Sequence, residues 1–184
     1  MDQLQQPAFP EFLRESLQRA GLKAGSFVWC GPEEIPEPCR GLLVHAADMT
    51  STLERHHGEP MTLEVLADGE AHGYYFREVI LRGAKTGRSA EFGLIEIEIG
   101  QFPEDLREAI LSGRQPLGGI LNQSGMQYVS SPLGYFSVVR DLLPPKLSAL
   151  GSEETFFGRY NQLSTKNGIC LARILEILPT PPSP

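Results

Sequence analysis

The sequence of 184 residues predicts an α+β fold, with a single antiparallel sheet of about six strands and helices packed on one side of it. Three observations lead to this prediction. Several stretches alternate apolar and polar residues, which is typical of strands with one wet face. Short glycine-bearing turns join most of these stretches as hairpins. Stretches with helical periodicity are grouped before the strands or inserted once between them, so they do not form alternating βαβ units.

The length and the hydrophobic content of 41% fit one domain over residues 1–184. Residues 1–10 are polar and contain prolines, which predicts a loose N-terminal arm. The tail over 179–184 is rich in proline and can continue neither a helix nor a strand. Between them, apolar residues at helical spacing predict a first short helix over 12–20. Residues 31–38 contain three prolines and interrupt regular structure.

Two further helices are expected. Residues 39–57 place apolar side chains on one helical face, and Gly58 is a natural stop. Asp48 and Thr50 lie within this stretch, but both are weak helix formers and could mark a cap or a break. Proline and acidic residues open a third helix over 103–113.

The strands account for most of the remaining chain. Gly69 and Gly73 frame the turn of one hairpin, and Lys166-Asn167-Gly168 forms a strong turn in another. Residues 116–121 predict a short turn or a single helical turn. The predicted strands cover 61–66, 74–81, 90–99, 126–130 with 135–143, 155–164 and 169–178.

Charge and cysteine usage exclude several classes of function. The net charge of −7 and the pI near 5.1 argue against binding to nucleic acid or to an anionic membrane surface. The sequence shows no spanning apolar run and no signal peptide, so we expect a cytoplasmic protein. Cys30, Cys39 and Cys170 are odd in number and lack metal-ligand spacing, so neither a disulfide framework nor a zinc site is expected. His56 and His57 favour an exposed pair at a helix end over a metal site.

The strand over 74–81 carries the most informative residue of the chain. It is aromatic and aliphatic except for Arg77 and Glu78, and its side chains alternate between two faces. Tyr75, Arg77 and Val79 therefore share one face. A guanidinium among such residues stays charged, and an unpaired buried charge is costly. Arg77 therefore needs an anion.

Two sources of this anion are open. The chain could supply a structural ion pair from a neighbouring strand. Alternatively, Arg77 could await a ligand carboxylate, whose geometry matches the planar fork of arginine. Acidic residues that could form the structural pair are Glu78, Glu91, Glu96 and Glu98.

Gly93 interrupts the next predicted strand. Glycine within a strand marks either a bulge or a place where another group approaches closely. Both alternatives stay open at this point.

Six short motifs follow one another along residues 45–180. They are Asp48-Met49-Thr50, the following Met61-Thr62-Leu63-Glu64-Val65, the arginine strand Tyr75-Phe76-Arg77-Glu78-Val79-Ile80-Leu81, the turn Gln115-Pro116-Leu117-Gly118, Gly158-Arg159 and the closing Ile177-Leu178-Pro179. In order and approximate spacing, these motifs together resemble the chorismate lyase family.

The resemblance implies a chorismate-lyase-like fold and the cleavage of chorismate to 4-hydroxybenzoate and pyruvate, with no metal or organic cofactor. It implies that Arg77 binds a carboxylate of the substrate or product and that Met49 packs on the ring. Leu117 would close the pocket, and Gly93 would leave room for the ligand. A glutamate on the last strand would contact the hydroxyl end of the ligand and assist proton transfer, and Glu176 is the candidate for this role.

Glu176 departs from the family pattern by one residue toward the terminal proline. A shift of one residue reverses the face of a strand. Either a bulge restores the direction of Glu176, or Leu175 occupies the functional position. Arg159 could assist with a second carboxylate, or it could pair with one of the chain's own glutamates.

The first functional expectation is therefore a chorismate pyruvate-lyase that acts as a monomer, with catalytic residues Arg77 and Glu176 and with Met49, Gly93 and Leu117 completing the binding site. The alternative is a non-catalytic binding domain of the same fold for a small aromatic carboxylate. A third possibility is an enzyme that acts on a chorismate relative.

Overall fold

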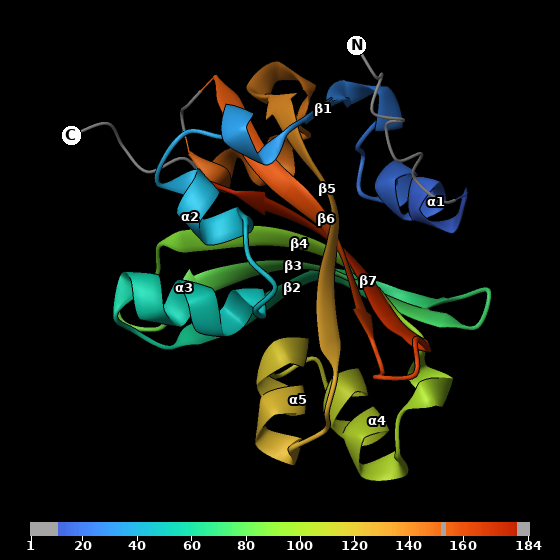
Figure 1. Cartoon of the computed structure of the whole chain (residues 1–184). Coiled ribbons are helices and arrows are strands. Elements are labelled where there is room, and N and C mark those ends of the chain that lie inside the picture. The colour runs from blue at the N-terminus through green and yellow to red at the C-terminus, as the bar shows by residue number, and fades with distance from the viewer. Residues whose placement is uncertain (1–10, 152–153, 180–184) are drawn as a thin grey trace.

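A computed structural model describes residues 11–151 and 154–179 and contains one seven-stranded sheet (Figure 1). The strands lie in the order β1-β5-β6-β7-β4-β3-β2, and every neighbouring pair is antiparallel. The expected α+β class with one antiparallel sheet is confirmed, with seven strands where about six were expected. The strands are β1 (Phe27–Cys30), β2 (Met61–Ala71), β3 (Tyr74–Gly83), β4 (Ser89–Ile97), β5 (Val129–Val139), β6 (Thr155–Ser164) and β7 (Cys170–Leu178).

Tight turns join β2 to β3 and β6 to β7. His72 and Gly73 link β2 to β3, and both have positive φ, 53° and 83°. Two left-handed residues match the right-handed twist of a two-residue hairpin. Gly168, with φ 82°, provides the same conformation between β6 and β7. The predicted hairpins are therefore present, although Gly69 lies inside β2 and not in the turn.

Helices lie on both faces of the sheet. The helices α2 to α5 share one face, which agrees with the expected one-sided arrangement, whereas α1 contributes Leu17 and Ala20 to the core on the opposite face. Figure 1 places α1 near the N-terminus and apart from α3, α4 and α5. The helices are α1 (Glu11–Arg19), α2 (Cys39–Leu43), α3 (Met49–His57), α4 (Glu104–Leu111) and α5 (Leu117–Ser124).

The prediction of a single helix over 39–57 is wrong, because the chain forms two helices there. α2 ends at Leu43 and α3 begins at Met49. Asp48 is the N-cap of α3 and accepts a hydrogen bond from the backbone N–H of Ser51 at 2.8 Å. This cap satisfies a donor that would otherwise be unpaired, so Asp48 begins a helix instead of continuing one. Gly58 ends α3 with φ 67°, as expected.

The two faces of the sheet have separate cores. On the α1 face, Phe92, Leu94 and Leu175 pack with residues of β5 and β6. On the other face, α4 and α5 pack on β3, β4 and β7 around Ile95 and Leu117. Because side chains alternate along a strand, Gly93 and Ile95 lie on the face opposite to Phe92 and Leu94. The face that α2 to α5 cover holds the pocket described next.

The expected arm over 1–10 lies outside the described residues, as does the tail after Pro179. Of the described helices, none is long and apolar enough to cross a lipid bilayer.

Candidate ligand-binding pocket

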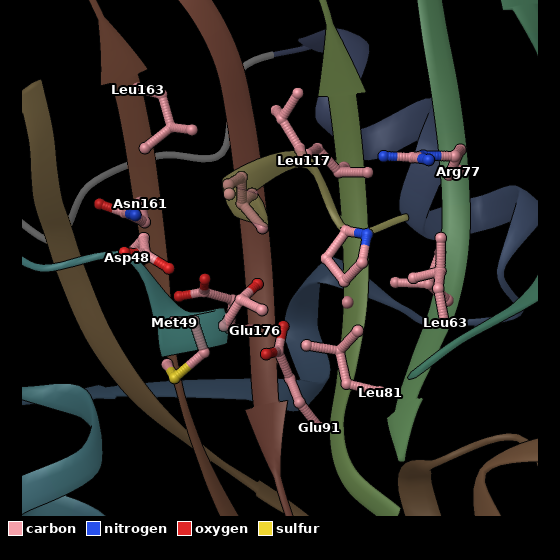
Figure 2. Close-up of a pocket in the computed structure, with 17 residues that line it drawn as sticks. Asp48, Met49, Leu63, Arg77, Leu81, Glu91, Leu117, Asn161, Leu163 and Glu176 are labelled. Carbon is pink, nitrogen blue, oxygen red and sulfur yellow. The ribbon is translucent and has the colours of Figure 1, made fainter. Parts of the chain in front are cut away.

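A pocket lies between the covered face of the sheet and the first turns of α3 and α5 (Figure 2). It contains about 540 Å³ of space free of protein atoms, counting its opening to solvent. Its floor comes from β3, β4, β6 and β7, with Leu63 of β2 at one side. The structure brings together in this pocket all the residues that the sequence indicated for the site, namely Met49, Arg77, Gly93, Leu117 and Glu176.

Arg77 is buried in the floor of the pocket, with 1% of its surface exposed. Its Nη1 lies 3.4 Å from the carbonyl oxygens of both Ile110 and Gln115, and its Nε has no hydrogen-bond partner within the described chain. No carboxylate of the described residues forms an ion pair with it. Burial lowers the pKa of Arg77, and nearby Tyr75 and Asp68 partly oppose this shift. The site therefore holds a cation with few polar partners.

Three of the acids that could have paired with Arg77 are engaged elsewhere. Glu78 pairs with Lys146, and Glu96 accepts a hydrogen bond from Ser16. Glu98 accepts one from the hydroxyl of Tyr74 at 3.0 Å. The fourth acid, Glu91, lines the same pocket but lies four strand positions away, because β4 pairs Ile95 with Arg77. The structural ion pair is thus not formed.

Glu176 faces the pocket without a bulge. The pairing of β7 with β4 runs unbroken from Ala172 to Ile177 and sets Glu176 opposite Gly93. Leu175 points to the other face, where it is part of the core. Leu175 therefore does not face the pocket, and no bulge is needed to direct Glu176 into it, because the even positions of β7 already face the cavity.

Arg159 holds Glu176 in a buried ion pair. The two residues are register partners on β6 and β7, and Arg159 is fully buried. Its Nη1 also donates hydrogen bonds to the carbonyl oxygens of Leu43 and His45, at 3.2 and 3.1 Å. These hydrogen bonds connect the segment between α2 and α3 to the sheet. Arg159 therefore pairs with the chain's own glutamate and does not line the pocket.

Glu91 is a pocket residue that sequence reasoning did not assign to the site. It is 4% exposed, and its Oε2 has no hydrogen-bond partner among the described residues. Burial, and then the neighbouring charge of Glu176, raise the pKa of Glu91 well above its ordinary value. Strand alternation in the sequence could have predicted that Glu91 lines the pocket, because Glu91 lies two residues before Gly93 and therefore on the same face of the strand.

Gly93 makes room for the pocket. A Cβ atom at this position would lie 3.0 Å from Cγ2 of Val79 and 3.2 Å from Oε1 of Glu91. The register shift between β3 and β4 occurs at Leu81 and Arg82, not at Gly93. The close approach of the Val79 and Glu91 side chains to Gly93, and not a bulge, therefore explains why a glycine is needed here.

Met49 and Leu117 form the cover opposite the sheet. Each is the first residue of its helix, and Figure 2 shows both side chains directed toward the strands. Met49 is 5% exposed and Leu117 is 4% exposed. Apolar groups therefore cover the pocket on this side, opposite the cation in its floor.

We expect the substitution Gly93→Ala to destabilise the protein by about 1 to 3 kcal/mol, because the added methyl group overpacks the floor between Val79 and Glu91. Urea unfolding measures this loss. Gly100→Ala is the matched control, since a Cβ there meets no atom within 4 Å, and it should change stability by less than about 0.5 kcal/mol. Equal effects of the two substitutions would contradict the assignment.

The raised pKa of Glu91 predicts a pH dependence of stability. A carboxyl whose pKa is higher in the folded state binds more protons there than in the unfolded state, so stability falls as pH rises above its unfolded pKa. The variant Glu91→Gln removes this loss. Above about pH 4.5, the free energy of unfolding of Glu91→Gln should rise relative to that of the wild type by no more than about 1.4 kcal/mol per pH unit. The difference should level off above the pKa that Glu91 has in the folded state. Urea unfolding at several pH values tests this, and a constant difference would refute it.

Among the described residues, no group of three or more His, Cys, Asp or Glu side chains could hold a metal ion. His56 and His57 lie exposed in the last turn of α3, as the sequence indicated.

The fold is similar to two solved structures. The effector domain of PhnF from Mycobacterium smegmatis aligns with a TM-score of 0.52 at 11% identity, over 71% of this chain and 87% of that domain. PhnF from the same organism aligns with a TM-score of 0.52 at 12% identity, over 90% of this chain and 76% of that chain. The sequence matches no family model and no curated protein. At such low identity the likeness defines the fold, and the expected chorismate-lyase-like architecture is confirmed.

Proposed function

We propose that the pocket binds a small aromatic or cyclic carboxylate through Arg77, and that the protein is a chorismate pyruvate-lyase. The observation that carries this proposal is the buried guanidinium of Arg77, which lines a cavity and lacks an acidic partner in the described chain. A desolvated arginine binds a carboxylate through paired charge-assisted hydrogen bonds. Such a ligand would supply the anion that the chain does not.

The walls of the pocket suit the rest of the ligand. Val79, the register partner of Gly93, and Ile95, two residues after Gly93, line the floor, and Met49 and Leu117 lie opposite them. A planar ring between these apolar groups would be removed from water, and its carboxylate would reach Arg77. Figure 2 shows Glu91 and Glu176 close to one another and apart from Arg77.

The chemistry of chorismate requires few groups. The ring carbon that carries the hydroxyl loses its proton to a base, and the electron pair of that C–H bond completes the aromatic ring. At the same time the bond between the ring and the enolpyruvyl oxygen breaks, its electron pair leaves with the oxygen, and the departing enolate takes up a proton at its CH₂ carbon to become pyruvate. Arg77 would hold the ring carboxylate, and Glu176 would accept the proton. The reaction gives 4-hydroxybenzoate and pyruvate.

A second candidate function is ligand binding without catalysis. Chorismate carries two carboxylates, yet Arg77 is the only arginine or lysine among the described residues that line the pocket, because Arg159 pairs with Glu176. A ligand with one carboxylate matches this charge better. One of the solved structures with a similar fold is described as an effector domain.

The test is to incubate the purified protein with chorismate, with no added metal, and to measure 4-hydroxybenzoate and pyruvate. Production of both in equal amounts, lost in Arg77→Ala and kept in Arg82→Ala, supports the lyase. Arg82 is the matched control because it lies on the same strand outside the pocket, paired with Glu64. Tight binding of 4-hydroxybenzoate without turnover would favour the binding domain, and neither binding nor turnover would refute both.

A further inference from the structure

We infer that Glu91 is the specificity-determining residue of the pocket, a carboxylic acid that donates a hydrogen bond to an oxygen at the end of the ligand remote from its carboxylate. The inference rests on the proposed function, since it takes Arg77 as the carboxylate partner. It selects ring carboxylates with a hydroxyl or ether oxygen at the far end over those without one.

The position of Glu91 places it at the opposite end of the ligand. β3 and β4 pair Arg77 with Ile95 and Leu81 with Glu91, so Arg77 and Glu91 lie four residues apart along the same face. Four residues of strand span about 13 Å, and both side chains line the pocket. Gly93 lies midway, and because it has no side chain nothing projects from this position of the floor.

Glu91 also has the free atom that such a contact requires. Its side chain is 4% exposed and lines the pocket, yet its Oε2 meets no hydrogen-bond partner among the described residues. Buried polar atoms are nearly always hydrogen-bonded, and an unpaired one costs free energy. A ligand oxygen at this atom would remove that cost.

Glu176 is less available for the same contact. Arg159 binds its Oε2 through Nε and reaches its Oε1 through Nη2 at 3.5 Å. The last-strand glutamate is therefore held by an internal cation. Glu91 has no such partner in the described part of the chain, and burial first, and then the nearby charge of Glu176, raise its pKa and favour its protonated form. A protonated carboxyl is a hydrogen-bond donor, which a carboxylate is not.

The experiment compares the dissociation constants of 4-hydroxybenzoate and unsubstituted benzoate by calorimetry. The wild type should bind 4-hydroxybenzoate at least about tenfold more tightly. Glu91→Met, which keeps the length of the side chain, should bring the two constants within about twofold by weakening 4-hydroxybenzoate alone. Glu91→Gln should keep most of the preference, because its amide still donates.

Glu96 provides the matched control. It is a buried glutamate of the same strand and also has an Oε2 without a partner in the described chain, but it faces α1 and not the pocket. Glu96→Gln should leave both dissociation constants unchanged. Thermal unfolding of each variant verifies that it is folded. If Glu91→Met does not fold, the inference is tested with Glu91→Gln alone. Loss of the preference for 4-hydroxybenzoate in Glu91→Gln would overturn the inference.

The inference is also overturned if the wild type binds both compounds equally, if the preference survives Glu91→Met, or if that substitution weakens both compounds to the same extent. Each of these results leaves the carboxylate pocket itself intact. Failure of the wild type to bind either compound would instead remove the proposed function, and the inference with it.

Discussion

Replacing Arg77 with methionine is expected to weaken the binding of 4-hydroxybenzoate at least about 100-fold, because the ligand carboxylate would be buried without a cation. Any lyase activity should fall by at least the same factor. Calorimetry and product assays measure the two quantities. Arg77→Lys should recover only part of the affinity, since a lysine ammonium lacks the planar fork that meets both carboxylate oxygens.

The same substitution should have the opposite effect on stability. Arg77 is desolvated and has no acidic partner among the described residues, so its removal from the empty protein should cost little or should stabilise it. Arg82→Met is the control, because Arg82 is 28% exposed and its Nε bonds Glu64 at 2.5 Å outside the pocket. It should leave ligand affinity unchanged. Equal loss of affinity in Arg77→Met and Arg82→Met would contradict the assignment.

Replacing Arg159 with methionine is expected to destabilise the protein by about 3 to 5 kcal/mol, a large part of the stability of a domain. The substitution leaves Glu176 buried without its cation and beside Glu91. It also removes the hydrogen bonds to the carbonyl oxygens of Leu43 and His45. Urea unfolding at neutral pH measures the loss.

The double variant Arg159→Met, Glu176→Leu distinguishes the loss of stability caused by the unpaired buried charge from the loss caused by altered packing. Removing both charges should restore part of the stability, because no buried carboxylate is left unpaired. Arg40→Met is the matched control. Arg40 and Glu37 form an ion pair with side chains that are 46% and 58% exposed, so its loss should cost less than about 1 kcal/mol. A double variant as unstable as Arg159→Met alone would refute the buried-charge explanation.

Much of the fold could be predicted because the sheet is built from hairpins. Local alternation and turn residues define β2, β3, β4, β6 and β7 without knowledge of the rest of the chain. β1 was missed because Phe27–Cys30 has only four residues, too few to show a period. The break between α2 and α3 was underestimated because Arg159, distant in sequence, binds the carbonyl oxygens of that segment.

The site was partly predictable for a similar reason. Arg77 and Gly93 lie on adjacent strands of one hairpin, so alternation alone places them on one face. Glu176 could not be placed from the sequence, because its direction depends on whether β7 contains a bulge, and long-range pairing with β4 and β6 decides this. Glu91 was considered only as a partner for Arg77, and its burial became evident only from the packing of the pocket.

The order of the strands has a consequence for the exchange of amide protons with solvent. The floor strands β3, β4, β6 and β7 each have a neighbour on both sides, so their amide protons should resist exchange with deuterium until the whole domain opens. The two helices that form the cover, α3 and α5, are joined by weaker contacts. The exposed side chain of Asn122 in α5 donates hydrogen bonds to Asp48 at 3.2 Å and to Ser51 at 3.3 Å, at the start of α3. We therefore expect the amide protons of these two helices to exchange before those of the sheet beneath them.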